Sequence, residues 1–452
     1  MGIGSKSKYL KSQFEVDDKI MKKTTSQIIK DVKVKKTSRF ISGVLNSLAK
    51  MLYFKPCSVD FIRRVEPNDY KNEPLIIVAN HSSRFDYAFV QGAMRKRQIN
   101  FVSAEEEFHR TKFKTVFKLG QVIPKKSFVP DTNAIRGMTR IIRNAKNGCV
   151  GIFPCGLSTV GGAQQPSVSG TGKMLKHFGV RVLAVRISGA YLVCPKFDLK
   201  ERYGHVEVEL FELFSPEQLK EMSADEIERK VDEAIFVDDY EWNATRQNSY
   251  KRKDGKFAEN MEQILYKCPK CNTEMQMEGR GDKIVCKHCG NGAILDDKYN
   301  LKPIGESVIP RNPREWYDWE RREMRKEVKS PDFVMEEHVV LSVQPKYGYV
   351  KKNLVAYPVG DGMLRMDEKG LTYNGTRDGK PWQVFIPSDL LYTTIMNVDG
   401  SFFSTYTSGE FLMFTPDSPS SVRWNMAIEE IYRVNGGKWQ NFPWFNYDKQ
   451  GF

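Results

Sequence analysis

The chain has 452 residues, of which 40% are hydrophobic and 28% charged. This balance is typical of a folded protein and excludes a disordered or fibrous chain, and the length predicts about two to four domains. The net charge of +14 favours anionic partners such as nucleic acid, acidic lipid headgroups or phosphorylated substrates. We expect neither a membrane span nor a signal peptide, because no apolar stretch approaches about 18 residues and the first residues are polar.

The amino terminus is the most basic part of the chain. Residues 1–57 hold 13 Lys and Arg residues against 4 Asp and Glu residues, a surplus of +9. Between Ser38 and Phe54, apolar residues recur at intervals of three and four, which predicts an amphipathic helix flanked by basic residues. Two interpretations remain open: a helix that lies in a membrane interface, or a surface helix that packs on the next domain.

Strand-like and helix-like stretches alternate between residues 75 and 213. Short apolar runs predict strands at 75–80, 99–104, 121–124, 149–154, 180–189 and 205–213. Amphipathic stretches predict helices at 87–97, 111–119, 134–144 and 172–178. This alternation predicts an α/β fold with a largely parallel sheet flanked by helices. Because such sheets bind ligands beyond the carboxyl ends of their strands, the residues that follow the strands are the candidate site.

The first of these strands runs into the heptapeptide Asn80-His81-Ser82-Ser83-Arg84-Phe85-Asp86. A turn there would bring the Asp86 carboxylate onto one imidazole nitrogen of His81 and leave the other nitrogen facing the crevice. An imidazole held in this way can take a proton from a hydroxyl as that hydroxyl attacks an acyl carbon. The alternative is that His81 only caps the following helix.

The segment from about Leu75 to Phe197 resembles the PlsC-type glycerolipid acyltransferases, such as the 1-acylglycerol-3-phosphate acyltransferases. Four blocks occur in the family's order: Asn80 to Asp86 for its NHxxxxD, Gly120 to Lys126 for a strand that ends in a basic residue, Phe153 to Ser158 for its FPEGTR, and Lys173 to Lys196 for its closing block. The resemblance implies that His81 is the general base and that Asp86 orients it. It also implies a fatty acyl donor, as a thioester of CoA or acyl-carrier protein, and a lysophospholipid acceptor, first of all 1-acylglycerol 3-phosphate.

The third block departs from the family pattern. Cys155 stands in place of Glu, Leu157 in place of Thr, and Ser158 in place of an Arg that in the family helps to bind the acceptor phosphate. The identity of the acceptor therefore stays open, with glycerol 3-phosphate and a lyso-aminolipid as alternatives. A non-catalytic lipid-binding protein is the alternative to an enzyme. Cys155 is interpreted as a small residue in a vacated Glu site, or else as an acyl-carrying nucleophile.

The substrate-binding candidates surround these blocks. They are Arg84, Lys125, Lys126, Cys155, Gly156, Ser158 and Lys173. Lys125, Lys126, Lys173 and the two arginines Arg136 and Arg140 are the cations that could supply the charge of the missing Arg.

The eight cysteines fall into two groups. Cys57, Cys149, Cys155 and Cys194 are scattered, whereas Cys268, Cys271, Cys286 and Cys289 form two C-x-x-C pairs separated by 14 residues. Four thiolates on two tight turns can surround one tetrahedral Zn²⁺, so we predict a structural zinc ribbon in a reducing compartment. The residues around the ribbon form no basic and aromatic surface, and we expect no nucleic-acid partner.

The chain changes character after the cysteines. A charged stretch at 313–329 predicts a helix. From residue 338 to 416 short strand-like runs alternate with Gly, Pro, Asp and Asn before a helix at 420–434. The runs are 338–343, 354–358, 363–366, 370–375, 382–386, 390–396, 401–407 and 410–414. This pattern resembles a pleckstrin-homology (PH) or GRAM domain, with a lipid-binding, regulatory or scaffold role open.

Five parts are therefore predicted. They are a basic amphipathic region (1–57), an acyltransferase domain with trailing charged helices (58–266), a zinc ribbon (267–300), a helical linker (301–334) and a PH/GRAM-like β domain (335–452). The surplus of positive charge at the amino terminus favours an anionic membrane surface. We expect a cytoplasmic protein that is peripheral at the inner face of the membrane.

Overall fold

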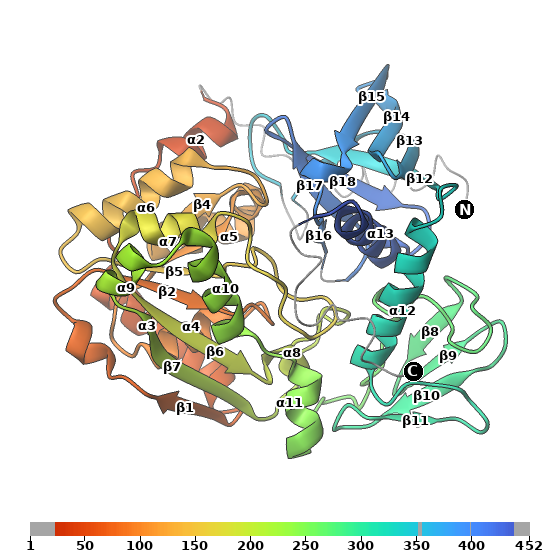
Figure 1. The fold of residues 1–452 in the computed structure, drawn as a ribbon, viewed down its shortest axis with the longest axis horizontal. Helices are drawn as coiled ribbons and strands as arrows, with labels where there is room; N and C mark the ends of the chain where they lie inside the picture. The colour runs from red at the N-terminus through yellow and green to blue at the C-terminus, as the bar shows by residue number, and fades with distance from the viewer. Residues whose placement is uncertain (1–22, 351–354, 398, 438–452) are drawn as a thin grey trace.

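A seven-stranded sheet organises the amino-terminal part of the molecule (Figure 1). The computed structural model describes residues 23–350, 355–397 and 399–437. The sheet has the order β1-β7-β6-β2-β5-β3-β4, and every neighbouring pair is parallel except β6 and β7. Its strands are β1 (Val59–Arg63), β2 (Leu75–Ala79), β3 (Asn100–Ala104), β4 (Ile123–Lys125), β5 (Cys149–Ile152), β6 (Arg181–Ser188) and β7 (Val206–Phe214). The prediction of a mostly parallel α/β sheet is confirmed.

Helices cover both faces of this sheet. Every side chain of the central strand β2 is buried, because alternate residues point to opposite layers. Leu75 and Ile77 belong to the same core as Phe89 of α4, whereas Ile76 and Val78 share a core with residues of α6, α7 and α10. The helices are α2 (Thr25–Asp31), α3 (Arg39–Ala49), α4 (Asp86–Ala93), α5 (Thr111–Gly120), α6 (Thr132–Asn144), α7 (Thr171–Phe178), α8 (Ala190–Val193), α9 (Pro216–Glu221), α10 (Ala224–Ile235) and α11 (Asp239–Arg246).

The amphipathic stretch before β1 is helical, as predicted. Helix α3 continues into a π-helical turn, η1 (Lys50–Phe54), whose aromatic residues pack under α4. The ring of Tyr53 stacks on that of Phe85 at 4.2 Å, and Phe54 stacks on Phe89 at 6.0 Å. The carboxyl-terminal end of the stretch is therefore anchored to the sheet.

A four-stranded antiparallel sheet carries the cysteine pairs. Its order is β11-β10-β9-β8, with β8 (Met277–Arg280), β9 (Lys283–Cys286), β10 (Gly292–Leu295) and β11 (Leu301–Pro303). The predicted helices before this sheet end at Arg246, since Gln247 adopts a left-handed conformation and residues 247–266 hold only the short 3₁₀ turn η4 (Met261–Gln263). This segment fills the core with irregularly spaced side chains such as Tyr250 and Met261, a pattern without helical period. The predicted linker helix is α12 (Pro313–Val328).

A second seven-stranded sheet, fully antiparallel, forms the carboxyl-terminal part (Figure 1). Its order is β15-β14-β13-β12-β18-β17-β16, and α13 (Ser421–Val434) closes the series. The strands are β12 (Met335–Val343), β13 (Tyr357–Asp367), β14 (Gly370–Arg377), β15 (Lys380–Pro387), β16 (Ile395–Met396), β17 (Phe403–Thr407) and β18 (Glu410–Pro416). Of the strand-like run 354–358, Leu354 lies outside the described residues. The run 390–396 is strand only at its end.

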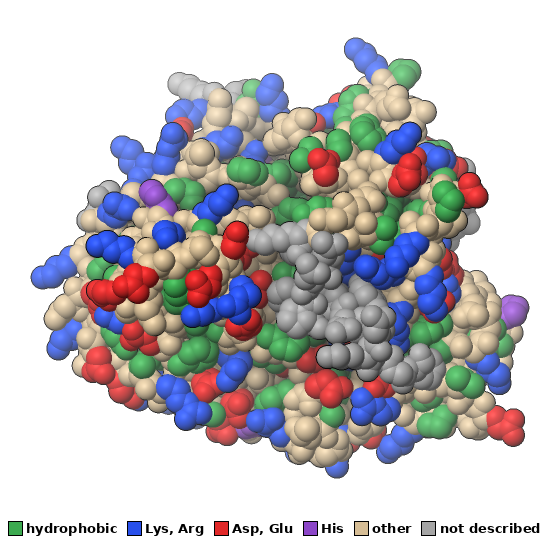
Figure 2. Space-filling view, viewed as in Figure 1, with side chains coloured by type: hydrophobic (Ala, Val, Ile, Leu, Met, Phe, Trp, Pro, Cys, Tyr) green, Lys and Arg blue, Asp and Glu red, His purple; other side chains and the backbone are tan. Residues whose placement is uncertain are grey.

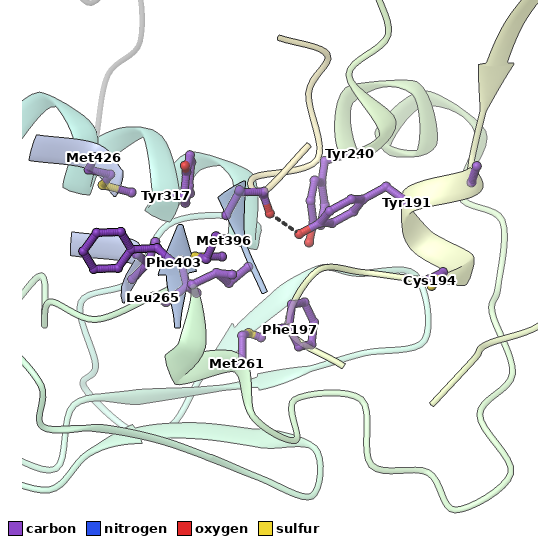
Figure 3. Close-up of a cluster of buried hydrophobic side chains, with 14 of the residues drawn as sticks. Tyr191, Cys194, Phe197, Tyr240, Met261, Leu265, Tyr317, Met396, Phe403 and Met426 are labelled. Atoms are coloured by element: carbon purple, nitrogen blue, oxygen red, sulfur yellow. Dashed lines mark hydrogen bonds between the residues drawn. The ribbon is translucent and has the colours of Figure 1, made fainter. Parts of the chain in front are cut away.

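One hydrophobic core joins the three sheets. Figure 3 shows side chains of this core, among them Tyr191 of α8, Met261 of η4, Tyr317 of α12 and Phe403 of β17. The Tyr191 hydroxyl donates a hydrogen bond to the carbonyl oxygen of Val160 at 2.5 Å, the dashed line in that view. The polar end of this buried ring is thereby satisfied, and the sheets form a continuous packed body.

Charge and apolar surface are distributed differently over the molecule. On the face shown in Figure 2, acidic and basic side chains are intermixed. Large exposed apolar side chains gather on α3 and η1: Phe40, Val44, Leu45, Leu48, Met51 and Leu52, with Phe40 75% exposed. In the part of the chain that the structure describes, we find no helix that combines the length and the apolar character needed to cross a bilayer.

Candidate active site

His81 and Asp86 lie at the carboxyl end of β2, where the chain turns into α4. Nδ1 of His81 is 2.8 Å from Oδ2 of Asp86. The same carboxylate accepts hydrogen bonds from the amides of Ser82 and Ser83, at 2.7 and 2.8 Å, and from the Ser83 hydroxyl at 2.6 Å. Because Asp86 is fully buried, these donors and the positive amino-terminal end of α4 balance its charge.

Neighbouring strands hold the backbone of this turn. The side-chain amide of Asn80 donates to the carbonyl oxygen of Ile187 and its own oxygen accepts from the Ile187 amide, both at 2.7 Å. These two bonds continue the pairing of β2 with β6 by one residue. The His81 amide donates to Oε1 of Gln164 at 2.9 Å, and the His81 carbonyl oxygen accepts from the Thr159 amide at 3.0 Å. His81 is thus fixed from both sides.

The imidazole of His81 is partly exposed. Its side chain is 24% exposed and its ring stacks on Phe153, with the ring centroids 4.5 Å apart. With the Nδ1 hydrogen directed at Asp86, the other nitrogen, Nε2, carries a lone pair. The arrangement can therefore take a proton from a hydroxyl that reaches Nε2.

The loop after β5 lies beside His81. Gly156 is exposed and has a φ of 77°, a conformation that favours glycine. Cys155 is buried, and its Sγ donates to the carbonyl oxygen of Leu157 at 3.1 Å. Burial raises the pKa of the Cys155 thiol to about 11. A nucleophilic cysteine needs a lowered pKa, so this environment is not that of an acyl-carrying thiolate.

The structure places the candidate cations on protein oxygens or on helices of the opposite layer from α4. Nζ of Lys125 donates to the carbonyl oxygen of Lys126 at 2.9 Å, and burial lowers the pKa of Lys125. Nζ of Lys126 donates to the carbonyl oxygen of Gly409 at 2.6 Å. Arg84 donates to the carbonyl oxygen of Leu199 at 2.5 Å. The remaining three candidates lie on helices of the opposite layer: Arg136 and Arg140 on α6, and the exposed Lys173 on α7.

Lys196 contacts the third block and was not among the candidates. It follows α8, and its Nζ lies 3.2 Å from Oγ of Ser158, the last residue of the third block. Burial lowers the pKa of Lys196 to about 8. A signal was present in the sequence, because Lys196 is the only charged residue in the run Tyr191 to Phe197. A lone lysine in an otherwise apolar stretch predicts a buried ammonium group.

The four clustered cysteines converge on one point. All four sulfur atoms lie within 4.8 Å of one another. Sγ of Cys268 is 3.7 Å from that of Cys289, and Sγ of Cys271 is 3.8 Å from that of Cys286. Zn–S bonds of about 2.3 Å in a tetrahedron place the sulfur atoms about 3.8 Å apart. The four cysteines therefore fit a single tetrahedral metal ion.

Comparison with known proteins now adds to this geometry. Residues 61–188, which contain His81, Asp86 and the loop after β5, match the family model described as Acyltransferase. Over this segment the chain is similar to the acyltransferases. The resemblance found in the sequence is confirmed at this coarser level.

Two further comparisons were made. The crystal structure of the 1-acyl-sn-glycerophosphate (LPA) acyltransferase PlsC from Thermotoga maritima matches at 23% identity and a TM-score of 0.36, over 44% of this chain and 77% of that one. No curated protein matches the chain significantly.

Proposed function

We propose that the protein transfers a fatty acyl group from an acyl thioester to the hydroxyl of a lysophospholipid, first of all 1-acylglycerol 3-phosphate, which gives phosphatidate. The observation that supports this most is the bond of His81 Nδ1 to Asp86, which leaves Nε2 as a base inside the segment that matches the acyltransferase family. The donor is acyl-CoA or acyl-carrier protein.

The residues divide the chemistry between them. His81 Nε2 takes the proton of the acceptor hydroxyl as its oxygen attacks the thioester carbonyl carbon. Asp86 keeps the imidazole in the correct tautomer and stabilises the imidazolium that forms. When the C–S bond breaks, the imidazolium returns its proton to the thiolate. The products are an ester and a free thiol, and His81 is regenerated.

An acyl-transfer assay against several acceptors tests this function. Purified full-length protein is given radiolabelled acyl-CoA or acyl-carrier protein with 1-acylglycerol 3-phosphate, glycerol 3-phosphate or a lyso-aminolipid. We expect the highest kcat/KM with 1-acylglycerol 3-phosphate. A preference for either of the other acceptors would change the substrate but keep the reaction. Binding of the two lysolipids without turnover of any acceptor would favour a non-catalytic lipid-binding protein.

We propose Zn²⁺ as the metal of the four-cysteine cluster, in a structural zinc ribbon. When bound, the ion would be held by Cys268, Cys271, Cys286 and Cys289, which leave no open coordination position for catalysis. Elemental analysis of protein purified without added metal should give one equivalent of zinc. Cys268→Ser should lose the metal, and Cys57→Ala, which changes a buried cysteine outside the cluster, should retain it. A protein with no stoichiometric zinc would contradict the proposal.

We propose that α3 and η1 attach the protein to the inner face of the membrane from the cytoplasm. The exposed apolar side chains of this segment support that interpretation over a helix packed on the next domain. Lys35, Lys36, Arg39, Lys50 and Lys55 flank it, and each basic side chain near an anionic surface contributes about 1 kcal/mol. Residues 1–22 of the basic amphipathic region (1–57) lie outside the described residues.

Liposome binding tests the attachment. Replacing Leu45 and Leu48 with Asp should weaken binding to anionic liposomes, and added salt should weaken the binding of the native protein. Replacing Val308 and Val334, equally exposed apolar residues elsewhere, with Asp serves as the control. If both double variants bind like the native protein, the α3 segment is not the membrane anchor.

For the domain organisation we propose the five parts predicted above. The carboxyl-terminal part, with its antiparallel sheet and single closing helix, is compatible with a PH/GRAM-like domain. Limited proteolysis should cut first at the proposed boundaries near residues 57, 266, 300 and 334, and a different set of first cuts would revise them.

A further inference from the structure

Lys196 is a buried ammonium group without a counter-charge in its first contacts. Among the described residues, the hydrogen-bond partner of its Nζ is the Ser158 hydroxyl, and no carboxylate oxygen lies within 4.0 Å of this nitrogen. The carboxylates in its wider surroundings are Glu107, whose nearest cation is Arg110 at 3.3 Å, and Asp399. Buried charges in proteins are normally paired. The position is therefore suited to a ligand that brings a negative charge.

The hydrogen bond between Lys196 and Ser158 has a fixed direction. An ammonium group only donates, so Oγ of Ser158 is the acceptor. The hydroxyl hydrogen of Ser158 must then point elsewhere, and the side chain is only partly buried. An anionic oxygen of a ligand could accept this hydrogen, with the positive charge of Lys196 directly behind it. The two side chains form one donor unit for an anion.

A backbone hydrogen bond connects the loop of Ser158 to the proposed base. Ser158 precedes Thr159, whose amide donates to the carbonyl oxygen of His81 at 3.0 Å. In 1-acylglycerol 3-phosphate the reacting hydroxyl and the phosphate sit on adjacent carbon atoms. In acyl-CoA, by contrast, the pantetheine arm separates the thioester from the nucleotide phosphates. A cation held by the loop that bonds to His81 therefore fits the phosphate of the acceptor better than those of the donor.

We propose that Ser158 and Lys196 together bind the phosphate monoester of the acceptor and place its hydroxyl at His81. The inference rests on the proposed acyl transfer and names two residues that recognise the acceptor. Ser158 donates the hydrogen bond and Lys196 supplies the charge. The cation thus comes from the segment after α8 rather than from the loop after β5.

Ligand binding and turnover, measured on the same full-length proteins, test the proposal. Isothermal titration gives the affinity for glycerol 3-phosphate, CoA and dephospho-CoA. The variants are Lys196→Met and Ser158→Ala, with Lys220→Met, an exposed lysine of α9, as the matched control. Loss of a charge-assisted hydrogen bond should weaken glycerol 3-phosphate binding about 10- to 100-fold in both variants and leave the control unchanged. The KM for 1-acylglycerol 3-phosphate should rise by a similar factor, with kcat changed less than about threefold.

The outcomes separate this inference from the proposed function. If Lys196→Met turns over with an unchanged KM for phosphate-bearing acceptors, the inference is wrong and acyl transfer stands. If no acceptor is acylated but glycerol 3-phosphate binding still depends on Lys196, the anion site stands and acyl transfer fails. Weaker binding of CoA, with glycerol 3-phosphate unaffected, would assign the unit to the donor and overturn the proposal. A loss confined to kcat in Ser158→Ala would assign Ser158 to the transition state rather than to acceptor binding, which also overturns the proposal.

Discussion

Two polar pairs stand beside each other at the carboxyl edge of one sheet, and their charges are balanced in different ways. Asp86 accepts four hydrogen bonds from its own heptapeptide, one of them involving His81. Lys196 is also buried, but its Nζ has a single hydroxyl, that of Ser158, as its hydrogen-bond partner among the described residues. The charge of the first pair is balanced within the protein, whereas the charge of the second is balanced only when an external anion binds.

The difference separates two tasks of an active site. A base must keep its geometry before and after each reaction, so its partners belong to the protein. A binding group must exchange its partner in every cycle, so it stays incompletely satisfied and destabilises the free protein. Three substitutions can break or sharpen this comparison.

The largest effect is expected at His81. His81→Ala should lower kcat about 10²- to 10⁴-fold, because a general base contributes that much to the rate. The fold should persist, since Asp86 keeps its three other hydrogen bonds. Activity is measured by radiolabelled acyl transfer, with His177→Ala, an exposed histidine of α7, as the control. A near-native rate in His81→Ala would refute the mechanism.

Asp86→Asn should have a smaller effect on activity. The imidazole remains, but its tautomer and orientation are no longer set, so we expect kcat to fall about 10- to 100-fold. The amide group also removes an acceptor from buried donors, which should lower the free energy of unfolding by about 1–3 kcal/mol. Steady-state kinetics and denaturant unfolding measure the two effects. A kcat loss as large as that of His81→Ala would mean that Asp86 takes part in the proton transfer itself.

The smallest effect, and one of opposite sign, concerns the stability of the free protein. Burial lowers the pKa of Lys196 in the folded state to about 8 from 10.5, so below pH 8 the folded protein holds an unfavourable buried charge. The unfolded chain binds more protons between pH 8 and 10.5, and the stability of the native protein therefore rises with pH over this window. Lys196→Met should be more stable by about 1–3 kcal/mol at pH 7. This advantage should fade towards pH 10.5 in thermal unfolding scans, and a variant less stable than the native protein at pH 7 would contradict it.

Much of the amino-terminal sheet could be predicted from the sequence. Strand β2 is a continuous apolar run, β6 is mostly apolar, and the helices between them show a clear period, so local pattern and tertiary structure agree. The segment 247–266 was harder to predict, since its apolar side chains fill gaps between the sheets and depend on neighbours distant in the sequence. The same holds for residues 390–394, where a strand-like composition forms a turn and loop before β16.

The candidate site was predictable to the extent that it lies in one contiguous stretch. His81 and Asp86 are five residues apart, and a single turn brings them into contact. Lys196 is 38 residues from Ser158, and their contact depends on how the segment after α8 folds back over the sheet edge. Spacing alone does not show that contact. The same limit applies to Lys126, a predicted substrate contact whose ammonium group binds the carbonyl oxygen of Gly409 in the turn between β17 and β18.

The β17–β18 hairpin also contacts the segment that matches the acyltransferase family at a second point. Glu106, just after β3, is buried and bonds the Ser127 hydroxyl at 2.8 Å and the Tyr406 hydroxyl at 3.1 Å. Burial raises the pKa of this carboxyl group to about 7. Residues of the carboxyl-terminal sheet thus contact both the Glu106 carboxyl group and the Lys126 ammonium group. A protein shortened before residue 335 would uncover this carboxyl group and free the ammonium group of Lys126. We therefore expect the segment that matches the acyltransferase family to be more stable with the β17–β18 hairpin than without it.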